Sequence, residues 1–85
     1  MLSIPKYIFA EKIAISLSTL RGWQRQYRQD LAKLGQQQND KVFNYLTVLY
    51  LCDKQVIDPS EFYPTVSQTE LQEHYNKINT LLYEK

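Results

Sequence analysis

Large hydrophobic side chains recur at helical spacing in the first half of the chain. At steps of three, four, four and three residues come Leu20, Trp23, Tyr27, Leu31 and Leu34. A second stripe, at steps of four and three, consists of Arg21, Arg25 and Arg28. No proline interrupts residues 18–34, so the spacing predicts one helix with an apolar face and a basic face. Gly35 follows directly, where a glycine commonly ends a helix.

A shorter apolar segment precedes this helix. Pro5 suits the first turn of a helix, because its missing N–H would have no partner there. The candidate buried positions after it are Ile8, Phe9 and Ile13. A turn at Ala14-Ile15-Ser16 follows, and Ser16 or Ser18 can cap the second helix. This order of short helix, turn and two-faced helix predicts a helix-turn-helix over about residues 5–34.

The central segment, residues 41–56, is apolar on most sides. Its sequence VFNYLTVLYLC is rich in β-branched and aromatic residues, which favours a strand. Its length, with Asn39 and Asp40 as candidate caps, favours a helix instead. We favour the helix and expect the segment to be the buried centre of the domain in either conformation.

Two capping signals mark the last third of the chain. Asp58-Pro59-Ser60-Glu61 has the residue order of one short helical turn, which Pro64 ends. Ser67-Gln68-Thr69-Glu70 is a capping box and predicts a helix over residues 67–84. At steps of four, three and four, its apolar seam consists of Leu71, Tyr75, Ile78 and Leu82. This seam either docks onto the domain's own core or forms a dimer interface.

Size and composition favour one mainly α-helical domain over residues 1–85. The 85 residues include only two glycines, which leaves little material for tight hairpins. The single cysteine, Cys52, cannot form an internal disulfide, which suits a reducing compartment. The start MLSIPKYIF lacks the features of a signal peptide, and no stretch approaches the roughly 20 apolar residues of a membrane span. We therefore expect a cytoplasmic protein that does not bind membranes.

Signals for catalysis are weak. His74 and Cys52 are each the only residue of their type and fall on different predicted elements. We expect a solvated His74 on a helix face and a buried, inert Cys52. No cluster of metal ligands is present, and the carboxylates are scattered over exposed faces. The sequence predicts no enzyme, no cofactor and no metal.

Charge is divided unevenly along the chain. Residues 1–41 carry seven basic and three acidic side chains, a net charge of +4, and residues 42–85 carry three basic and six acidic ones, a net charge of −3. Such asymmetry is expected when one end of a protein meets a polyanion. The second helix of a helix-turn-helix lies in the major groove of DNA with its first residues nearest the bases.

The candidate DNA-binding residues on and around that helix are Ser16, Ser18, Thr19, Arg21, Gly22, Gln24, Arg25 and Arg28. Arg21 is the leading candidate for a bidentate contact with guanine, and Arg25 and Arg28 for contacts with phosphate. Gly22 costs about 1 kcal/mol relative to alanine inside a helix, which a close approach of the DNA would explain.

The stretch FAEKIAIS followed by STLRGW resembles the opening of MerR-like DNA-binding domains and of the related small phage excisionase and Cox-type regulators. The resemblance covers residues 8–28, about a quarter of the chain. It implies a first-helix alanine at Ala10, an opening serine at Ser16, groove-facing Thr19 and Arg21, and buried supports at Leu20 and Trp23.

Two features depart from that family. Ala14 stands where the family usually has a glycine. A MerR-like wing, with glycine and arginine in a tight hairpin, is not visible after Leu34. Residues 36–45 are the stretch in which a degenerate wing would lie.

These observations predict a small protein that binds double-stranded DNA for transcription regulation or recombination directionality. We expect a phage or mobile-element origin and action as a homodimer or cooperative oligomer. The alternative is a small protein-binding inhibitor or adaptor, for example a phage factor against a host complex, that uses the acidic half and Tyr63, Tyr75 and Tyr83. In a third interpretation the basic end binds DNA and the acidic end recruits a second protein partner. An exposed basic helix favours DNA, and burial of that helix against the C-terminal helix favours the alternative.

Overall fold

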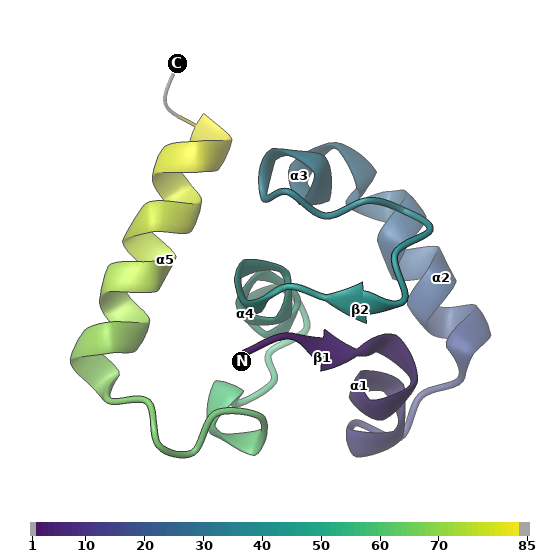
Figure 1. The fold of residues 1–85 in the computed structure, drawn as a ribbon, viewed down its shortest axis with the longest axis horizontal. Helices are drawn as coiled ribbons and strands as arrows, with labels where there is room; N and C mark the ends of the chain where they lie inside the picture. The colour runs from purple at the N-terminus through teal and green to yellow at the C-terminus, as the bar shows by residue number, and fades with distance from the viewer. Residues whose placement is uncertain (1, 84–85) are drawn as a thin grey trace.

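The fold of residues 2–83, which the computed structural model describes, consists of helices around one central helix, with a minimal antiparallel sheet (Figure 1). In chain order the elements are β1 (Ile4–Pro5), α1 (Lys6–Lys12), α2 (Leu17–Gln26), α3 (Arg28–Lys33), β2 (Val42–Phe43), α4 (Tyr45–Lys54), the 3-10 turn η1 (Pro59–Glu61) and α5 (Gln68–Tyr83). The prediction of a small, mainly α-helical domain is confirmed. In these residues, no helix is both long and apolar enough to cross a membrane.

Helix α4 lies at the centre of the molecule. All six residues from Thr47 to Cys52 are buried, with α5 on one side and the α1–α2 pair on the other (Figure 1). The preference for helix over strand in residues 41–56 is confirmed for Tyr45–Lys54, whereas Val42 and Phe43 form β2. Its cap is Asn44 and not the expected Asn39 or Asp40, because Asn44 Oδ1 accepts a hydrogen bond from the N–H of Thr47 at 2.8 Å.

The sheet joins the two ends of the helix-turn-helix region. Ile4 pairs with Phe43 and Pro5 with Val42, so the partner of β2 is the segment before α1 and not a hairpin of its own. Gln36, buried after α3, donates to the carbonyl oxygen of Val42 and accepts from the N–H of Asn44, both at 2.8 Å. The stretch suspected of holding a degenerate wing is thus a loop anchored by Gln36, followed by one short strand.

The helix predicted over residues 18–34 is two helices, with a bend at Tyr27. Tyr27 has φ −104° and ψ 17°, yet its N–H still donates to the carbonyl of Trp23 at 3.0 Å. The Tyr27 ring packs edge-on against Tyr50, with ring centroids 5.5 Å apart, and its hydroxyl accepts from Gln55 Nε2 at 3.2 Å. These contacts with α4 are long-range, so periodicity alone did not reveal the bend.

Helices α1, α3 and α4 end in the same hydrogen-bonded turn. The second residue after each helix is left-handed: Ala14 at φ 58°, Gly35 at 84° and Val56 at 55°. The following N–H reaches back to the helix in each turn, Ile15 to Ala10 at 3.0 Å, Gln36 to Leu31 at 2.9 Å and Ile57 to Cys52 at 2.8 Å. This is the Schellman arrangement, in which glycine is the unstrained residue. The turn after α1 therefore keeps its geometry without glycine, at the cost of strain at Ala14.

Replacing Ala14 by glycine should stabilise the protein. The left-handed conformation costs an alanine about 1–2 kcal/mol, and the larger entropy of glycine in the unfolded chain offsets part of the gain. We expect Ala14→Gly to raise the free energy of unfolding by about 0.5–1 kcal/mol in urea titrations. The matched control, Ala32→Gly at an exposed position inside α3, should lower it by about 1 kcal/mol. Equal losses in both variants would contradict a left-handed Ala14.

Both capping signals of the last third are confirmed. Asp58 accepts from the N–H of Ser60 at 2.9 Å, and Ser67 Oγ accepts from the N–H of Glu70 at 3.2 Å. Helix α5 runs from Gln68 to Tyr83, and the Glu84 end of the predicted helix lies outside the described residues.

The apolar seam of α5 contacts the chain's own core. Leu71, Ile78 and Leu82 are 4–7% exposed, and Tyr75 packs partly buried beside them. The dimer interface expected at these four residues is therefore corrected, because α4 is apolar on all sides and α5 covers it. The seam is not exposed for a second copy.

A hydrogen bond between Tyr50 and Asp30 ties α4 to α3. The Tyr50 hydroxyl donates to Asp30 Oδ2 at 2.6 Å from a side chain that is 3% exposed. Burial, together with this bond and the Asp30 charge, raises the pKa of Tyr50 well above its usual range. The folded protein therefore holds Tyr50 in its neutral form.

Stability should fall in alkaline solution, and Tyr50→Phe should reduce that fall. The unfolded chain ionises tyrosine near pH 10, whereas the folded chain does not, so the contribution of Tyr50 is complete below about pH 10 and decreases above it. At pH 7 the variant should lose about 1 kcal/mol of unfolding free energy with the hydrogen bond. Urea unfolding at about pH 7 and pH 11 measures both effects. Tyr7→Phe, at an exposed tyrosine, is the control and should change neither; an alkaline loss as large in Tyr50→Phe as in wild type would overturn the assignment.

Candidate nucleic-acid interface

A short helix, a four-residue connection and a second helix form the predicted helix-turn-helix. Helix α1 buries Phe9 and Ala10, and α2 begins after Ser16, whose Oγ accepts from the N–H of Thr19 at 3.1 Å. Figure 1 shows α1 nearly end-on while α2 runs across the view, so the two helices cross steeply. Leu20 is buried and Trp23 packs partly buried on the core, which leaves the opposite face of α2 toward solvent.

Seven of the eight candidate DNA-binding residues lie on the surface, and one does not. The exposed ones are Ser16, Ser18, Thr19, Arg21, Gly22, Arg25 and Arg28. Arg21 and Arg25 lie on α2, whereas Arg28 opens α3 beyond the bend at Tyr27. The bend therefore separates Arg28 from the stripe into which the sequence placed it.

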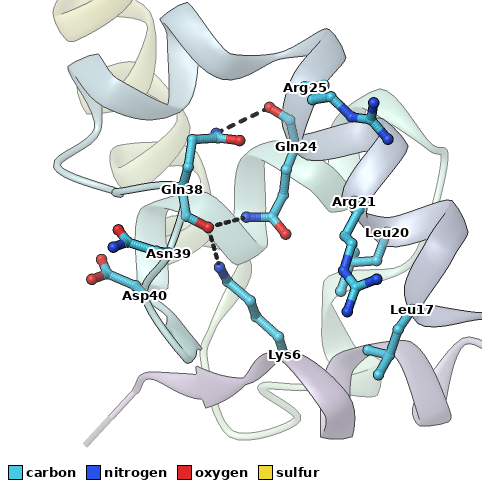
Figure 2. Close-up of a pocket in the computed structure, with 9 residues that line it drawn as sticks. All are labelled: Lys6, Leu17, Leu20, Arg21, Gln24, Arg25, Gln38, Asn39 and Asp40. Atoms are coloured by element: carbon cyan, nitrogen blue, oxygen red, sulfur yellow. Dashed lines mark hydrogen bonds between the residues drawn. The ribbon is translucent and has the colours of Figure 1, made fainter.

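The expectation for Gln24 is wrong, because its side chain is only 5% exposed and is used within the fold. Gln24 Nε2 donates to the carbonyl of Gln38 at 3.3 Å, and Gln38 Nε2 donates to the carbonyl of Gln24 at 3.2 Å (Figure 2). This reciprocal pair fastens α2 to the loop before β2. Nothing in the spacing indicated it, since Gln38 lies in a polar connector 14 residues away.

A hollow of about 420 Å³ separates α2 from that loop. Its α2 wall includes Leu17, Arg21 and Arg25, and its opposite wall includes Gln38, Asn39 and Asp40 (Figure 2). Among the described residues neither guanidinium has a hydrogen-bond partner, and Figure 2 shows both clear of the Gln24–Gln38 pair. Three cations, counting Lys6, and one carboxylate line the hollow, so its charge is net positive.

Lys6 is a member of this hollow that sequence reasoning missed. Its ammonium donates to the carbonyl of Gln38 at 3.0 Å and lies 5.4 Å from the centroid of the Phe43 ring. Burial lowers the pKa of Lys6, and the charge of Asp40 opposes that shift. Lys6 therefore supports the loop from below as well as contributing charge.

Two other lysines of the basic half are directed to the C-terminal half. Lys12 donates to the carbonyl of Glu61 at 2.8 Å and Lys33 to that of Leu82 at 3.3 Å. Two basic side chains of the first half thus bind backbone carbonyls of the second half. Five of the seven basic side chains of residues 1–41 remain for the α2 side of the molecule.

No contact within the chain requires a glycine at position 22. A Cβ built there would meet no heavy atom within 4 Å, and the position is exposed on α2 between the two arginines. An alanine would therefore fit without strain. The cost of this glycine to helix stability is not offset by any contact inside the protein.

Cys52 is buried as the sequence predicted, whereas His74 is not the solvated side chain that we expected. Cys52 is fully buried, and burial, followed by the charge of Asp58, raises the pKa of its thiol to about 12, in keeping with an inert side chain. His74 is not the solvated residue expected: its Nδ1 lies 2.7 Å from the Tyr45 hydroxyl, and its ring packs edge-on against that tyrosine. Within residues 2–83, no three His, Cys, Asp or Glu side chains gather as metal ligands.

Comparison with known proteins adds no relative: no protein family, no curated protein and no solved structure matches the chain. The resemblance of residues 8–28 to MerR-like and excisionase-type domains therefore stays a prediction from the sequence.

Proposed function

We propose that the chain is a small DNA-binding protein that inserts α2 into the major groove of double-stranded DNA. The observation that carries the proposal is the exposed face of α2, where Arg21 and Arg25 border an open, positively charged hollow. Helix α5 packs on α3 and α4 and leaves this face uncovered (Figure 1). An exposed basic helix is the arrangement that favours DNA over the protein-binding alternative.

Position assigns these residues to two kinds of DNA contact and to one helix cap. Thr19 and Arg21 lie in the leading turns of α2, so they support contacts with base edges, with Arg21 suited to guanine. Arg25, one turn later, is suited to a phosphate. Ser16 already uses its Oγ to cap α2, so its part is to fix the start of the helix.

The loop across the hollow offers a second place for the DNA backbone. Lys41 is exposed at its end, and Lys6 lies beneath it. A phosphate strand passing between α2 and this loop would meet Arg21 and Arg25 on the α2 wall and Lys6 on α1, with Lys41 outside the hollow. Asp40 opposes such contact, so we expect the α2 wall to contribute more of the binding energy.

The biological role that we propose is transcription regulation or recombination directionality, in a phage or mobile element, by analogy with the regulators that residues 8–28 resemble. One such domain makes few phosphate contacts, so specific binding calls for a second copy on a neighbouring site. Since the α5 seam is covered, that cooperation would use another surface or the DNA itself.

Replacing Arg21 tests the proposed reading of bases. Duplexes selected from a random pool should bind the full chain with an affinity that falls steeply between about 50 and 200 mM salt. In fluorescence anisotropy titrations, Arg21→Ala should weaken binding to the selected duplex by about 1–3 kcal/mol. The control is Lys77→Ala, which removes the same charge from exposed α5 and should change little. Absence of salt-sensitive binding to any duplex would refute the proposed function.

Gly22→Ala should move stability and DNA affinity in opposite directions. Alanine is favoured over glycine inside a helix by about 0.8–1.0 kcal/mol, so the unfolding free energy should rise by that amount. If glycine is present because the DNA backbone approaches closely, the added methyl group should at the same time weaken binding to the selected duplex. Urea unfolding and anisotropy on the same preparation separate the two effects. Unchanged or tighter DNA binding would show that position 22 does not meet DNA.

A further inference from the structure

A groove on the C-terminal half lies between the end of α4, the loop that follows it, and α5. Two adjoining hollows of about 530 and 280 Å³ form it and share Asp53, Gln72 and Tyr75. Its floor consists of buried core side chains, which include Cys52, Leu71, Ile78 and Leu82, and its accessible apolar surface comes from Val56, Ile57 and Tyr75. No residue of α2 lines either hollow, so the groove is separate from the proposed DNA interface.

Val56 lies at the edge of the larger hollow, and both its backbone conformation and its exposure to water are unfavourable for valine. It has φ 55°, a conformation that is exceptional for a β-branched residue, and its side chain is 94% exposed to water. A glycine or asparagine would end α4 with less strain and less apolar surface. Strained, exposed positions of this kind concentrate at functional sites, and here the position borders an apolar hollow.

The same hollow carries negative charge. Asp53 and Asp58 both line it and are exposed. Hydrogen bonds with Ser60 keep the pKa of Asp58 below its usual range, so its carboxylate is charged at neutral pH. Burial, with smaller contributions from neighbours that include both aspartates, raises the pKa of Tyr75 to about 12, so its hydroxyl stays protonated beside them. Gln68 and Gln72 add hydrogen-bonding amides to the rim.

The sequence suggested Tyr63, Tyr75 and Tyr83 as protein-binding residues, and the structure places only two of them at this groove. Tyr63 is buried, and its hydroxyl donates to the carbonyl of Leu2, so it belongs to the core. Tyr75 lines both hollows, and Tyr83 lies 67% exposed at the far end of the groove. Tyrosines that combine apolar area with a polar tip are enriched at protein interfaces.

We propose that this groove binds a segment of a partner protein in which a large apolar side chain is flanked by lysine or arginine. The exposed Val56 and the half-buried Ile57 and Tyr75 contact the apolar side chain. Asp53 and Asp58 pair with the basic residue. The commitment to a basic segment rests on charge complementarity: Asp53 and Asp58 line the larger hollow, whose lining contains no lysine or arginine, and Lys54 lines only the smaller one. Because the groove and α2 share no residue, the partner and DNA would bind independently.

A random dodecamer peptide library displayed on phage, panned against the immobilised full chain, tests the proposal. The enriched peptides should place lysine or arginine within two residues of a large apolar side chain. Added to the ¹⁵N-labelled chain, they should shift amide resonances of residues 52–59 and 68–75. Enrichment of acidic peptides, or of no peptides, would overturn the proposal, as would shifts confined to α2.

Variants separate binding from folding. Val56→Ala should weaken binding of the enriched peptide roughly tenfold without a loss of stability, because alanine lacks the β-branch that makes this backbone conformation unfavourable for valine. Val42→Ala, at an exposed valine in β2, is the matched control and should leave the affinity unchanged. The double variant Asp53→Asn/Asp58→Asn should weaken binding most at low salt, and asparagine preserves the cap at position 58. Equal affinity in wild type and Val56→Ala would reject the groove.

Two further measurements distinguish binding of a partner protein in this groove from self-association and from DNA binding. If the chain associates with itself through this groove in sedimentation experiments, the occupant is a second copy and not a different protein, which contradicts the proposal. DNA affinity should be the same in wild type and Val56→Ala. A loss of peptide binding with intact DNA binding therefore tests the groove alone, and a failure to bind DNA leaves this test unaffected.

Discussion

The burial of α4 is the constraint on which the rest of this structure depends. A helix that presents hydrophobic side chains in every direction is stable in water only when other elements surround it. In a chain of 85 residues few elements are available, so α5 covers one side and the α1–α3 region covers the other. The apolar seam of α5 is buried against α4, so this a/d-like pattern leaves no exposed surface for a second copy of the chain.

The same constraint shapes the candidate DNA interface. Leu31 and Leu34 must reach the core around α4, and the bend at Tyr27 turns α3 inward while the exposed face of α2 keeps Arg21 and Arg25 in solvent. The loop after α3 is then held by hydrogen bonds through Gln36 and Gln38, so the hollow beside α2 has two defined walls. The position of the basic face is therefore a consequence of how the central helix is covered.

Local chemistry was predictable from the sequence wherever it depends on neighbours along the chain. Ser16, Asp58 and Ser67 cap helices as their spacing indicated, and Gly35 ends α3 in the left-handed conformation. What the sequence did not reveal depends on distant partners. Gln24 is buried because a loop 14 residues later returns to it, and His74 packs on Tyr45 because α5 lies against α4. Ala14 shows a further limit, since a Schellman turn forms there although the residue that marks it is missing.

We propose that α2 and the loop facing it form the surface that meets DNA. Chemical-shift mapping of the ¹⁵N-labelled chain with a duplex selected from a random pool tests it most directly. We expect the largest shifts in residues 16–28 and in the loop 37–41, with α5 unchanged. Shifts concentrated in α5 and the α4–α5 groove, with α2 unaffected, would contradict it.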